Sequence, residues 1–345
     1  MTNPAPTTPQ PQALQITQVA PGLHGLRLPL PFQLNHINVW LLEDRMPDGS
    51  PAWTLVDTGV ASSLTRGIWE QIAAEVLQGW PVRQVIVTHF HPDHIGLADW
   101  LCRRFDAPLR MTRTEWLLAR MLSLDSSDEI AEAGRRFYGA MGLDDEMLAA
   151  LTVRGNAYAR GVPMVPATFD RLADGVTLRI GGREWTIITS GGHSPEHACL
   201  YSADDGVLIA GDMVLPRISP NVSVWPAEPF ADPLAEFLGG LARLRTLRAD
   251  TLVLPSHGSP FSGLQARIDE LTHHHAERLN EAVGFCGEGP RTIAEITRMM
   301  FNRTLDTHQM SFAAGEALAH LNHLEHQGRL VRQRREDGVW LFSRN

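Results

Sequence analysis

The sequence predicts an α/β fold in which two sheets are covered by helices. Short apolar runs recur along the chain and are bounded by Gly, Pro and Asp, as is typical of strands. Longer segments whose apolar residues follow a helical period separate several of these runs. Four of the runs end just before His or Asp residues, so we expect the ends of those strands to meet at one site.

The elements are expected in the following order. Residues 1–15 are rich in proline and should form a disordered tail. Between about 16 and 60, alternating runs such as 37–42 and 53–56 predict antiparallel strands. The later pattern predicts helices over 62–78 and 94–105, strands over 171–215 with a hairpin turn at 204–206, and helices over 232–247 and 262–284.

One short motif carries most of the chemical information. His89-Phe90-His91-Pro92-Asp93-His94 places four metal-capable side chains within six residues. The apolar run Val85-Ile86-Val87 precedes it and a helical pattern follows, so we expect a loop at the end of a buried strand. Imidazoles and a carboxylate at this density suit one or two divalent ions. A solvated His-rich turn is the alternative.

Three further segments end in the same way. His193 follows the run 185–188, Asp212 follows 207–210, and His257 follows 251–255. Each of these residues has a glycine within one position, which allows a sharp turn and a close approach of an ion. A single His or Asp in a turn is weak evidence, but four such strand ends together favour a metal site over a solvated turn.

These residues resemble the metallo-β-lactamase superfamily. Asp57-Thr58-Gly59, after the run 53–56, matches the Asp-x-Gly signature upstream of that family's metal motif, and the resemblance covers roughly residues 18 to 260. It implies an αββα sandwich with two metal ions. One ion would take His89, His91 and His193, the other would take Asp93, His94 and His257, and Asp212 would bridge them.

The resemblance also implies a mechanism. Two divalent ions lower the pKa of a shared water, and the resulting hydroxide is the nucleophile. Asp93 and Asp57 are the expected catalytic residues, with Asp57 orienting a ligand imidazole from behind; a turn or cap carboxylate is the alternative for Asp57. We expect Zn²⁺, with Fe or Mn as alternatives. His197 either hydrogen-bonds near the site or caps a strand.

Two segments exceed the minimal fold. Residues 113–168 form a largely helical insertion, expected as a lid or pocket wall for a small, partly apolar substrate, against an oligomerisation surface or a plain helical hairpin. Residues 286–345 contain two predicted helices, at 291–296 and 312–321, and a hairpin at 330–342, which together resemble a winged-helix module. The main domain is therefore predicted over 16–285.

The winged-helix-like module raises the question of nucleic acid. Its hairpin carries Arg329, Arg332, Arg334 and Arg335, which could contact phosphates. The net charge of −9 and the pI near 5.9 count against broad nucleic-acid or anionic-membrane binding. We therefore expect a packing role or a homodimer contact for the module. His273-His274-His275 and the stripe His320, His323 and His326 are not expected to form a second metal site.

Composition narrows the remaining classes. All 30 basic residues are Arg, which excludes Schiff-base chemistry on Lys. Three scattered cysteines suit a reducing compartment, and neither a secretory signal nor an 18-residue apolar run is evident. We therefore expect a cytoplasmic location and no membrane partner.

The expected activity is that of a dinuclear metallo-hydrolase acting on a small ester, thioester or lactone. The chain resembles the glyoxalase-II-like part of the superfamily more than true β-lactamases, because Asp212 stands where many of the latter have Cys. An endoribonuclease or another phosphodiesterase is the alternative, since the same attack works on phosphorus. An iron-dependent sulfur dioxygenase and a metal-sensing DNA-binding regulator are less favoured.

Overall fold

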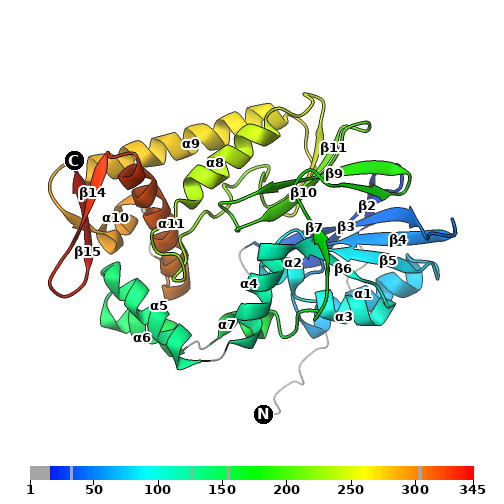
Figure 1. Cartoon of the computed structure of the whole chain (residues 1–345), viewed down its shortest axis with the longest axis horizontal. Coiled ribbons are helices and arrows are strands. Elements are labelled where there is room, and N and C mark those ends of the chain that lie inside the picture. The colour runs from blue at the N-terminus through cyan, green and yellow to red at the C-terminus, as the bar shows by residue number, and fades with distance from the viewer. Residues whose placement is uncertain (1–15, 32–33, 126, 154–155, 302–304) are drawn as a thin grey trace, which may run out of the picture.

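The computed structural model describes residues 16–31, 34–125, 127–153, 156–301 and 305–345 (Figure 1). The expected disordered tail, residues 1–15, lies outside this part of the chain. A mixed α/β sandwich forms one end of the molecule, and a mainly helical C-terminal region forms the other. None of the helices in the described residues is both long and apolar enough to cross a lipid bilayer.

Seven strands form the first sheet, in sequence order. Neighbours are antiparallel from the first strand to the fourth and parallel from the fourth to the seventh. The antiparallel strands over 16–60 were expected. The strands are β1 (Ile16–Ala20), β2 (Leu23–Pro29), β3 (His36–Arg45), β4 (Pro51–Val56), β5 (Val82–Ile86), β6 (Leu109–Thr112) and β7 (Asp170–Leu172).

Five strands form the second sheet, in the order β12-β11-β10-β9-β8. All neighbours are antiparallel except β11 and β12, which are parallel. The turn between β10 and β11 contains Asp204-Asp205-Gly206, as predicted. The strands are β8 (Thr177–Ile180), β9 (Arg183–Ser190), β10 (His197–Ser202), β11 (Val207–Gly211) and β12 (Leu252–Pro255).

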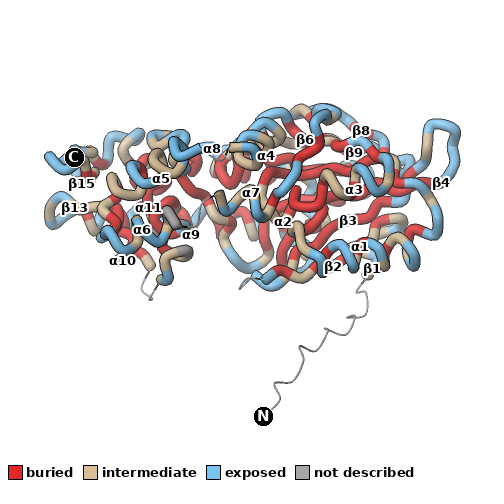
Figure 2. The backbone as a smooth tube through the Cα atoms, turned by 90° about the horizontal axis from the view of Figure 1, so that it is seen from below, coloured by how far each residue is buried: buried red, intermediate tan, exposed pale blue. Residues whose placement is uncertain are grey.

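The two sheets face each other across a buried apolar layer. Trp40 and Val56 of the first sheet share one cluster with Trp185, Leu200 and Leu254 of the second. Removal of these side chains from water is the main force holding the sheets together. In Figure 2 the buried backbone runs through the interior of this half of the molecule.

Helices cover the outer faces, which confirms the predicted sandwich. On the first sheet these are α1 (Ser63–Glu75) and α3 (Ala98–Phe105), and on the second they are α8 (Pro233–Leu244) and α9 (Leu264–Phe285). The helix predicted over 94–105 is divided: α2 (Pro92–Ile95) ends before Gly96 and Leu97, and α3 follows. A Cβ at position 96 would lie 2.4 Å from the carbonyl oxygen of Pro92, so this turn requires glycine.

The helical insertion divides between the two ends of the molecule. Helices α4 (Arg113–Leu124) and α7 (Ala157–Gly161) pack through Trp116 and Tyr158 against the core of the first sheet. Helices α5 (Asp128–Ala140) and α6 (Asp145–Val153) pack instead on the C-terminal region, where Phe137 is buried. Figure 1 shows the insertion connecting both parts of the structure.

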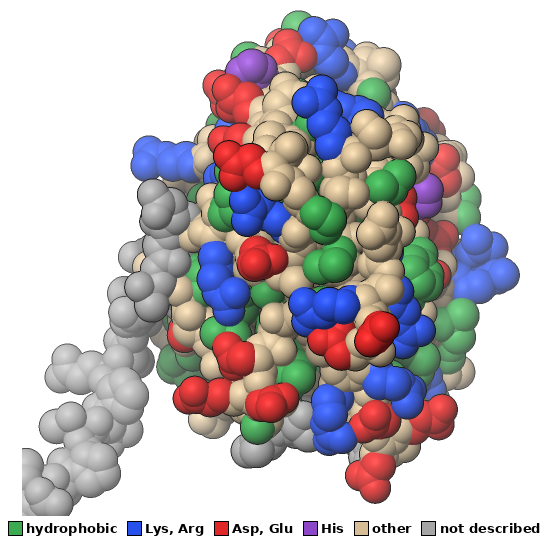
Figure 3. Space-filling model, turned by 90° about the vertical axis from the view of Figure 1, so that its left-hand side faces the viewer, with side chains coloured by type: hydrophobic (Ala, Val, Ile, Leu, Met, Phe, Trp, Pro, Cys, Tyr) green, Lys and Arg blue, Asp and Glu red, His purple; other side chains and the backbone are tan. Residues whose placement is uncertain are grey.

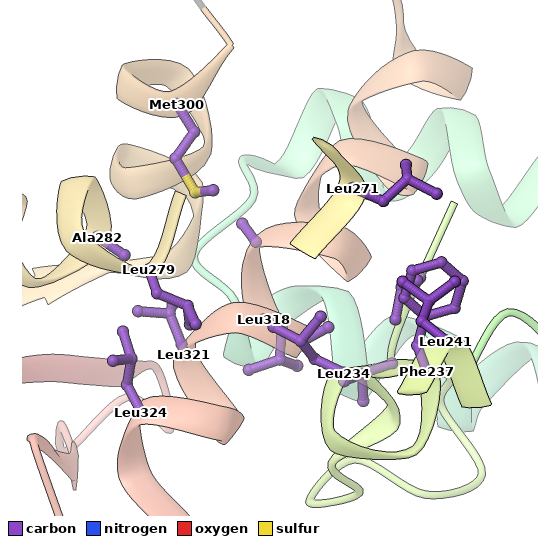
Figure 4. Close-up of a cluster of buried hydrophobic side chains, with 14 of the residues drawn as sticks. Leu234, Phe237, Leu241, Leu271, Leu279, Ala282, Met300, Leu318, Leu321 and Leu324 are labelled. Atoms are coloured by element: carbon purple, nitrogen blue, oxygen red, sulfur yellow. The ribbon is translucent and has the colours of Figure 1, made fainter. Parts of the chain in front are cut away.

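The C-terminal region contains two helices and a three-stranded sheet in the order β13-β15-β14. The helix predicted near 291–296 is present, and a capping box between Thr292 and Glu295 stabilises its N-terminus. The predicted hairpin is also present. The elements are β13 (Arg291–Thr292), α10 (Ile293–Met300), α11 (Thr307–His326), β14 (Leu330–Arg334) and β15 (Trp340–Arg344). Leucines of α8, α9 and α11 form one apolar cluster, drawn in Figure 4.

Polar groups are also buried where α9 and α11 meet. His275 Nδ1 lies 3.1 Å from His320 Nε2. Burial lowers the pKa of His275 to about 3 and that of His320 to about 4, so both rings are neutral at pH 7. Burial raises the pKa of Glu316 to about 7, although Arg278 opposes the shift.

Glu316 should make stability depend on pH. Its pKa is raised in the native state, so the native state holds the proton more strongly and stability is lost as the pH rises from about 4.5 to about 7. Glu316→Gln should therefore match the wild type at pH 4.5 and exceed it by ~3 kcal/mol at pH 8 in urea unfolding. The same substitution at the exposed Glu336 is the control, and an equal gain at both pH values would contradict the assignment.

The packing of α5 on the C-terminal region predicts that loss of a buried side chain of α5 destabilises the protein. Phe137 is 5% exposed and its ring lies 6.4 Å from that of Trp340. Phe137→Ala should lower the free energy of unfolding by about 3–5 kcal/mol, because it leaves a cavity. Leu117→Ala, at a position 53% exposed on α4, should change it by less than about 0.5 kcal/mol. Equal effects of the two substitutions in urea unfolding would show that α5 is not docked.

Candidate metal centre

Five strand ends bring the candidate residues to one edge of the sandwich. Asp57 follows β4 and the His motif follows β5 in the first sheet. His193, Asp212 and His257 follow β9, β11 and β12 in the second. Because the sheets are packed face to face, these loops meet although His89 and His257 are 168 positions apart in the sequence.

The structure brings all seven candidate ligands together in two groups. His89, His91, His193 and Asp212 form one, and Asp93, His94 and His257 form the other. Within each group, the ligand atoms of all members lie within 4.8 Å of one another. Five of the seven come from imidazole and two from carboxylate, a donor set that suits zinc and other divalent transition metals.

Asp212 lies between the two groups. Its Oδ2 is 3.4 Å from His193 Nε2 in the first group and 3.6 Å from His94 Nε2 in the second. Its Oδ1 is 3.4 Å from His257 Nε2. One carboxylate therefore reaches both groups of candidate ligands.

The hydrogen bonds on the outer side of the imidazoles fix which nitrogens face inward. His193 Nδ1 donates to the carbonyl of Asn221, and His257 Nδ1 donates to the carbonyl of His36, both at 2.8 Å. His94 Nδ1 donates to Asp57 Oδ2, also at 2.8 Å. Since these acceptors take the Nδ1 proton, the inward Nε2 atoms of neutral rings present lone pairs.

Two of the inward atoms lack a hydrogen-bond partner. His94 Nε2 and Asp212 Oδ1 are buried and have no hydrogen-bond partner within the described part of the chain. In the first group, His89 Nε2 lies 2.9 Å from His91 Nδ1 and 3.2 Å from His193 Nε2. One proton can lie between two of these nitrogens, but the third then faces them with a lone pair, which a bound cation would satisfy. The residues therefore fit a divalent metal.

The pKa shifts show that the second group attracts positive charge. Burial alone would lower the pKa of His94, but the carboxylates of Asp57, Asp93 and Asp212 outweigh it and raise that pKa well above its usual value. The pKa of His257 is raised for the same reason, chiefly by Asp212. His89, which is buried among other imidazoles, has a pKa well below its usual value and is neutral.

Asp57 contacts the candidate ligand His94 on the side of its ring that faces away from the other candidate ligands. Its backbone is in the left-handed region, with φ of +64°, a conformation that Asp tolerates better than most residues. Its Oδ1 accepts from the Thr88 amide at 2.9 Å while Oδ2 accepts from His94. The carboxylate thereby ties the start of the His motif to the ring of His94.

His197 points under the site rather than into it. Its Nε2 accepts the backbone amide of Asp212 at 3.1 Å. A Cβ at position 211 would lie 2.3 Å from that nitrogen, so only glycine leaves room for the ring. Of the two alternatives for His197, hydrogen bonding near the site is the one the structure shows: the ring fixes the backbone of Asp212.

Sequence reasoning missed Glu115 of α4. This fully buried carboxylate accepts from Phe90 N at 2.9 Å, Ser194 Oγ at 2.7 Å and Glu196 N at 2.6 Å. It therefore joins the loops that carry His91 and His193. Burial raises its pKa, although the three donors oppose the shift. The one signal in the sequence was a charged residue on the apolar face that also contains Leu118, Ala119 and Leu122.

The other histidines lie elsewhere. His273 is exposed and pairs with Glu277 at 3.1 Å, and His275 pairs with His320 as described above. His323 and His326 face Asp232, at 3.0 and 3.5 Å. None of them joins either group of candidate ligands in the described residues.

Comparison with known proteins agrees with this geometry. The family model "Metallo-beta-lactamase superfamily" matches residues 33–257. The chain belongs to this superfamily. A second model, "Metallo-beta-lactamase-like, C-terminal domain", matches residues 279–345. The metallo-β-lactamase fold and the potential metal-binding cluster are therefore those expected from the sequence, and the C-terminal region is one that recurs with this fold.

Relatives of the superfamily match almost the whole chain. A β-lactamase domain protein from Burkholderia ambifaria is 46% identical over 99% of this chain and 96% of its own, with a TM-score of 0.88. A metallo-β-lactamase family protein from Thermus thermophilus is 29% identical over 95% and 100% of the two chains, with a TM-score of 0.77. "Probable metallo-hydrolase YqjP" of Bacillus subtilis (strain 168) is 24% identical over 306 residues, 87% of this chain and 91% of its own.

Glu115 provides a test of how the ligand loops are held. Glu115→Gln keeps the side-chain shape but replaces one accepting oxygen with an NH₂ group. At least one buried donor then loses its acceptor, so the free energy of unfolding should fall by about 1–3 kcal/mol, and the affinity for Zn²⁺ should fall with it.

Urea unfolding and competition with a chromophoric chelator measure the two effects. Glu70→Gln is the control, because Glu70 is exposed and pairs with Arg104 at the surface. Wild-type stability and zinc affinity in Glu115→Gln would show that the ligand loops are held by other contacts.

Proposed function

We propose that the chain is a hydrolase that requires two divalent metal ions and cleaves a small ester, thioester or lactone. The observation that supports this most directly is the position of Asp212, whose two oxygens reach both groups of ligands. His89, His91 and His193 would hold one ion, and Asp93, His94 and His257 would hold the other. Zn²⁺ suits this set of nitrogen and oxygen donors, with Fe and Mn as the other candidates.

When bound, the two ions would supply a water of lowered pKa and would polarise the bond to be cleaved. The chain's own residues provide the geometry for this chemistry. Asp57, the carbonyl of Asn221 and the carbonyl of His36 each hold one ligand imidazole through Nδ1, so that Nε2 faces the site. These outer contacts fix both the tautomer and the orientation of the rings.

Asp93 is the acidic ligand that the substrate meets. Its side chain is 20% exposed, against 9% for Asp212, and its Oδ2 lies 3.4 Å from His257 Nε2. Because Asp93 is the more exposed of the two carboxylates, it can hold a proton near the leaving group, whereas Asp212 is more deeply buried. We assign Asp93 to this proton-handling role and Asp57 to orientation of His94.

An apolar side of the mouth favours a carbon ester over a phosphodiester. The ring of Trp225 lies 6.2 Å from Phe90 and 6.4 Å from His91, and Trp225 is 39% exposed. Tyr158 donates to the carbonyl of Phe90 at 2.6 Å, which ties α7 to the loop that carries His91. Aromatic walls around a few polar groups are typical of sites for small organic substrates.

The C-terminal region supports the phosphodiesterase alternative only weakly. Its order of one strand, two helices and a hairpin, preceded by the long helix α9, leads us to infer a winged-helix-like domain over 286–345. Arg332, however, lies between the rings of Phe230, Trp340 and Phe342, at 4.9 to 5.0 Å. Arg335 pairs with Asp337 at 2.7 Å. Figure 3 shows acidic and basic side chains interspersed on this end of the molecule rather than a basic patch.

We also infer where the protein acts. Cys102, Cys199 and Cys286 are all unpaired, which fits a reducing compartment such as the cytoplasm. Burial raises the pKa of each thiol, to about 12 for Cys102, so none of them is a reactive thiolate at neutral pH. This is consistent with hydrolysis that does not use a cysteine nucleophile.

Metal removal tests the proposed function. Dialysis against a chelator should reduce the hydrolysis of a panel of thioesters, 4-nitrophenyl esters and lactones to below about 1% of the starting rate, since the lowered pKa of water depends on the ions. Addition of Zn²⁺ or Mn²⁺ should restore it, with two ions per chain by elemental analysis. Asp212→Ala should abolish the activity.

His273→Ala is the matched control, because His273 is 74% exposed and belongs to neither group of candidate ligands. Its activity should equal that of the wild type. A metal-free preparation with full activity would refute the proposal, and cleavage of phosphodiesters without cleavage of any ester would favour the alternative.

A further inference from the structure

One segment connects the bridging residue Asp212 to helix α8 and lies against the C-terminal region. Residues 221–232 of this connection are called the mouth segment. It lacks helix or strand structure of its own, so its position depends on what it contacts. Its contacts fall at two places along α11.

The first place is next to the metal centre. The carbonyl of Asn221 holds His193 Nδ1, as described above. Ser223 Oγ donates to Asn221 Oδ1 at 2.8 Å, and the carbonyl oxygen of Phe312 in α11 lies 3.4 Å from the same hydroxyl oxygen. The amide of Val224 donates to the carbonyl of Gly315 at 3.2 Å. The residue that orients a candidate metal ligand is therefore tied to a helix of the C-terminal region.

Gly315 allows this close approach. A Cβ at position 315 would lie 3.1 Å from the Cβ of Ser223 and 3.3 Å from the carbonyl oxygen of Val224. Any side chain there would press on the mouth segment. Trp225, the next residue, stands beside Phe90 and His91 with 39% of its surface exposed. The contact with α11 thus also sets the position of the exposed aromatic ring at the mouth.

The second place is the far end of the mouth segment. Asn322 of α11 is fully buried, and its Nδ2 donates to the carbonyls of Pro229 and Ala231 at 3.2 and 2.7 Å. Its Oδ1 accepts from Arg332 at 2.6 Å, and the guanidinium of Arg332 lies 4.9 Å from the ring of Phe230. A buried amide that uses all of these groups holds the chain in one conformation, because breaking the contact leaves unsatisfied carbonyls.

We propose that α11 positions the metal centre, because its residues Asn322 and Gly315 hold the mouth segment in place. We propose further that an apolar group of the substrate packs on Trp225. The first part of this proposal, the positioning role of α11, concerns only this chain and the metal that it would bind. The substrate half rests on the proposed function, because it assumes that a substrate is cleaved at this site.

The central test is Asn322→Ala. Hydrogen–deuterium exchange of the mouth segment should become faster, and the affinity for Zn²⁺, measured by competition with a chromophoric chelator, should fall about tenfold because His193 is less well oriented. Ser223→Ala, a milder change on the segment itself, should shift both readouts in the same direction without loss of folding.

A control separates positioning from general loss of stability. Leu324 of α11 belongs to the cluster in Figure 4, which also contains Leu279 and Ala282 of α9. Leu324→Ala should destabilise the C-terminal region at least as much as Asn322→Ala, but it should leave the zinc affinity at the wild-type value. Equal loss of zinc affinity in the two variants, or none in Asn322→Ala and Ser223→Ala, would overturn the positioning role.

The substrate half has its own readout. With thioesters of increasing acyl length, wild-type kcat/KM should rise about threefold to fourfold for each methylene that packs on the ring. Trp225→Ala should remove that rise while leaving the zinc affinity unchanged, and Trp225→Phe should retain most of it. A rise that persists in Trp225→Ala would overturn this assignment. If the wild type cleaves no ester, the proposed function fails, but the zinc and exchange results still decide the role of α11.

Discussion

The structure depends on the convergence of electron-rich atoms at the edge where two sheets meet. Unprotonated imidazole nitrogens and carboxylate oxygens would repel one another if nothing held them. The fold holds them from behind: Asp57 and two backbone carbonyls orient the rings, His197 fixes the backbone of Asp212, and Glu115 joins the two loops. Many of the buried polar groups in this half of the molecule therefore hold the candidate ligands in an arrangement that can bind cations.

The residues that could be predicted were those that follow strands in short motifs. The His motif, His193, Asp212 and His257 stand next to apolar runs and glycines, so their meeting point followed from strand order alone. Glu115 and Asn221 could not be found in this way. Glu115 lies on an insertion and contacts loops 25 and 79 residues away, and Asn221 acts through a carbonyl that every residue has. The role of His197 depends on the left-handed backbone of Gly211, which the sequence pattern does not specify.

The fold shows a similar division. The alternating strands and amphipathic helices of the sandwich were predictable because each has a clear period, and only the break at Gly96 and Leu97 interrupts a predicted helix. The insertion was less predictable. Its apolar residues indicated helices but not partners, and the structure divides it between the sandwich and the C-terminal region, each with its own apolar cluster. Where each helix of the insertion packs thus depends on apolar surfaces formed by residues that are distant in sequence.

The origin of the ligands on both sheets has a consequence for the lifetime of the protein. Four come from the loop after β5, and three come from strand ends of the second sheet. An ion held by both would act as a reversible cross-link that exists only in the native state. At a hundredfold excess over its dissociation constant, such an ion adds about 2.7 kcal/mol to the free energy of unfolding. Starvation for the metal would then expose the chain to proteases, so that supply of the ion would govern the amount of protein as well as its chemistry.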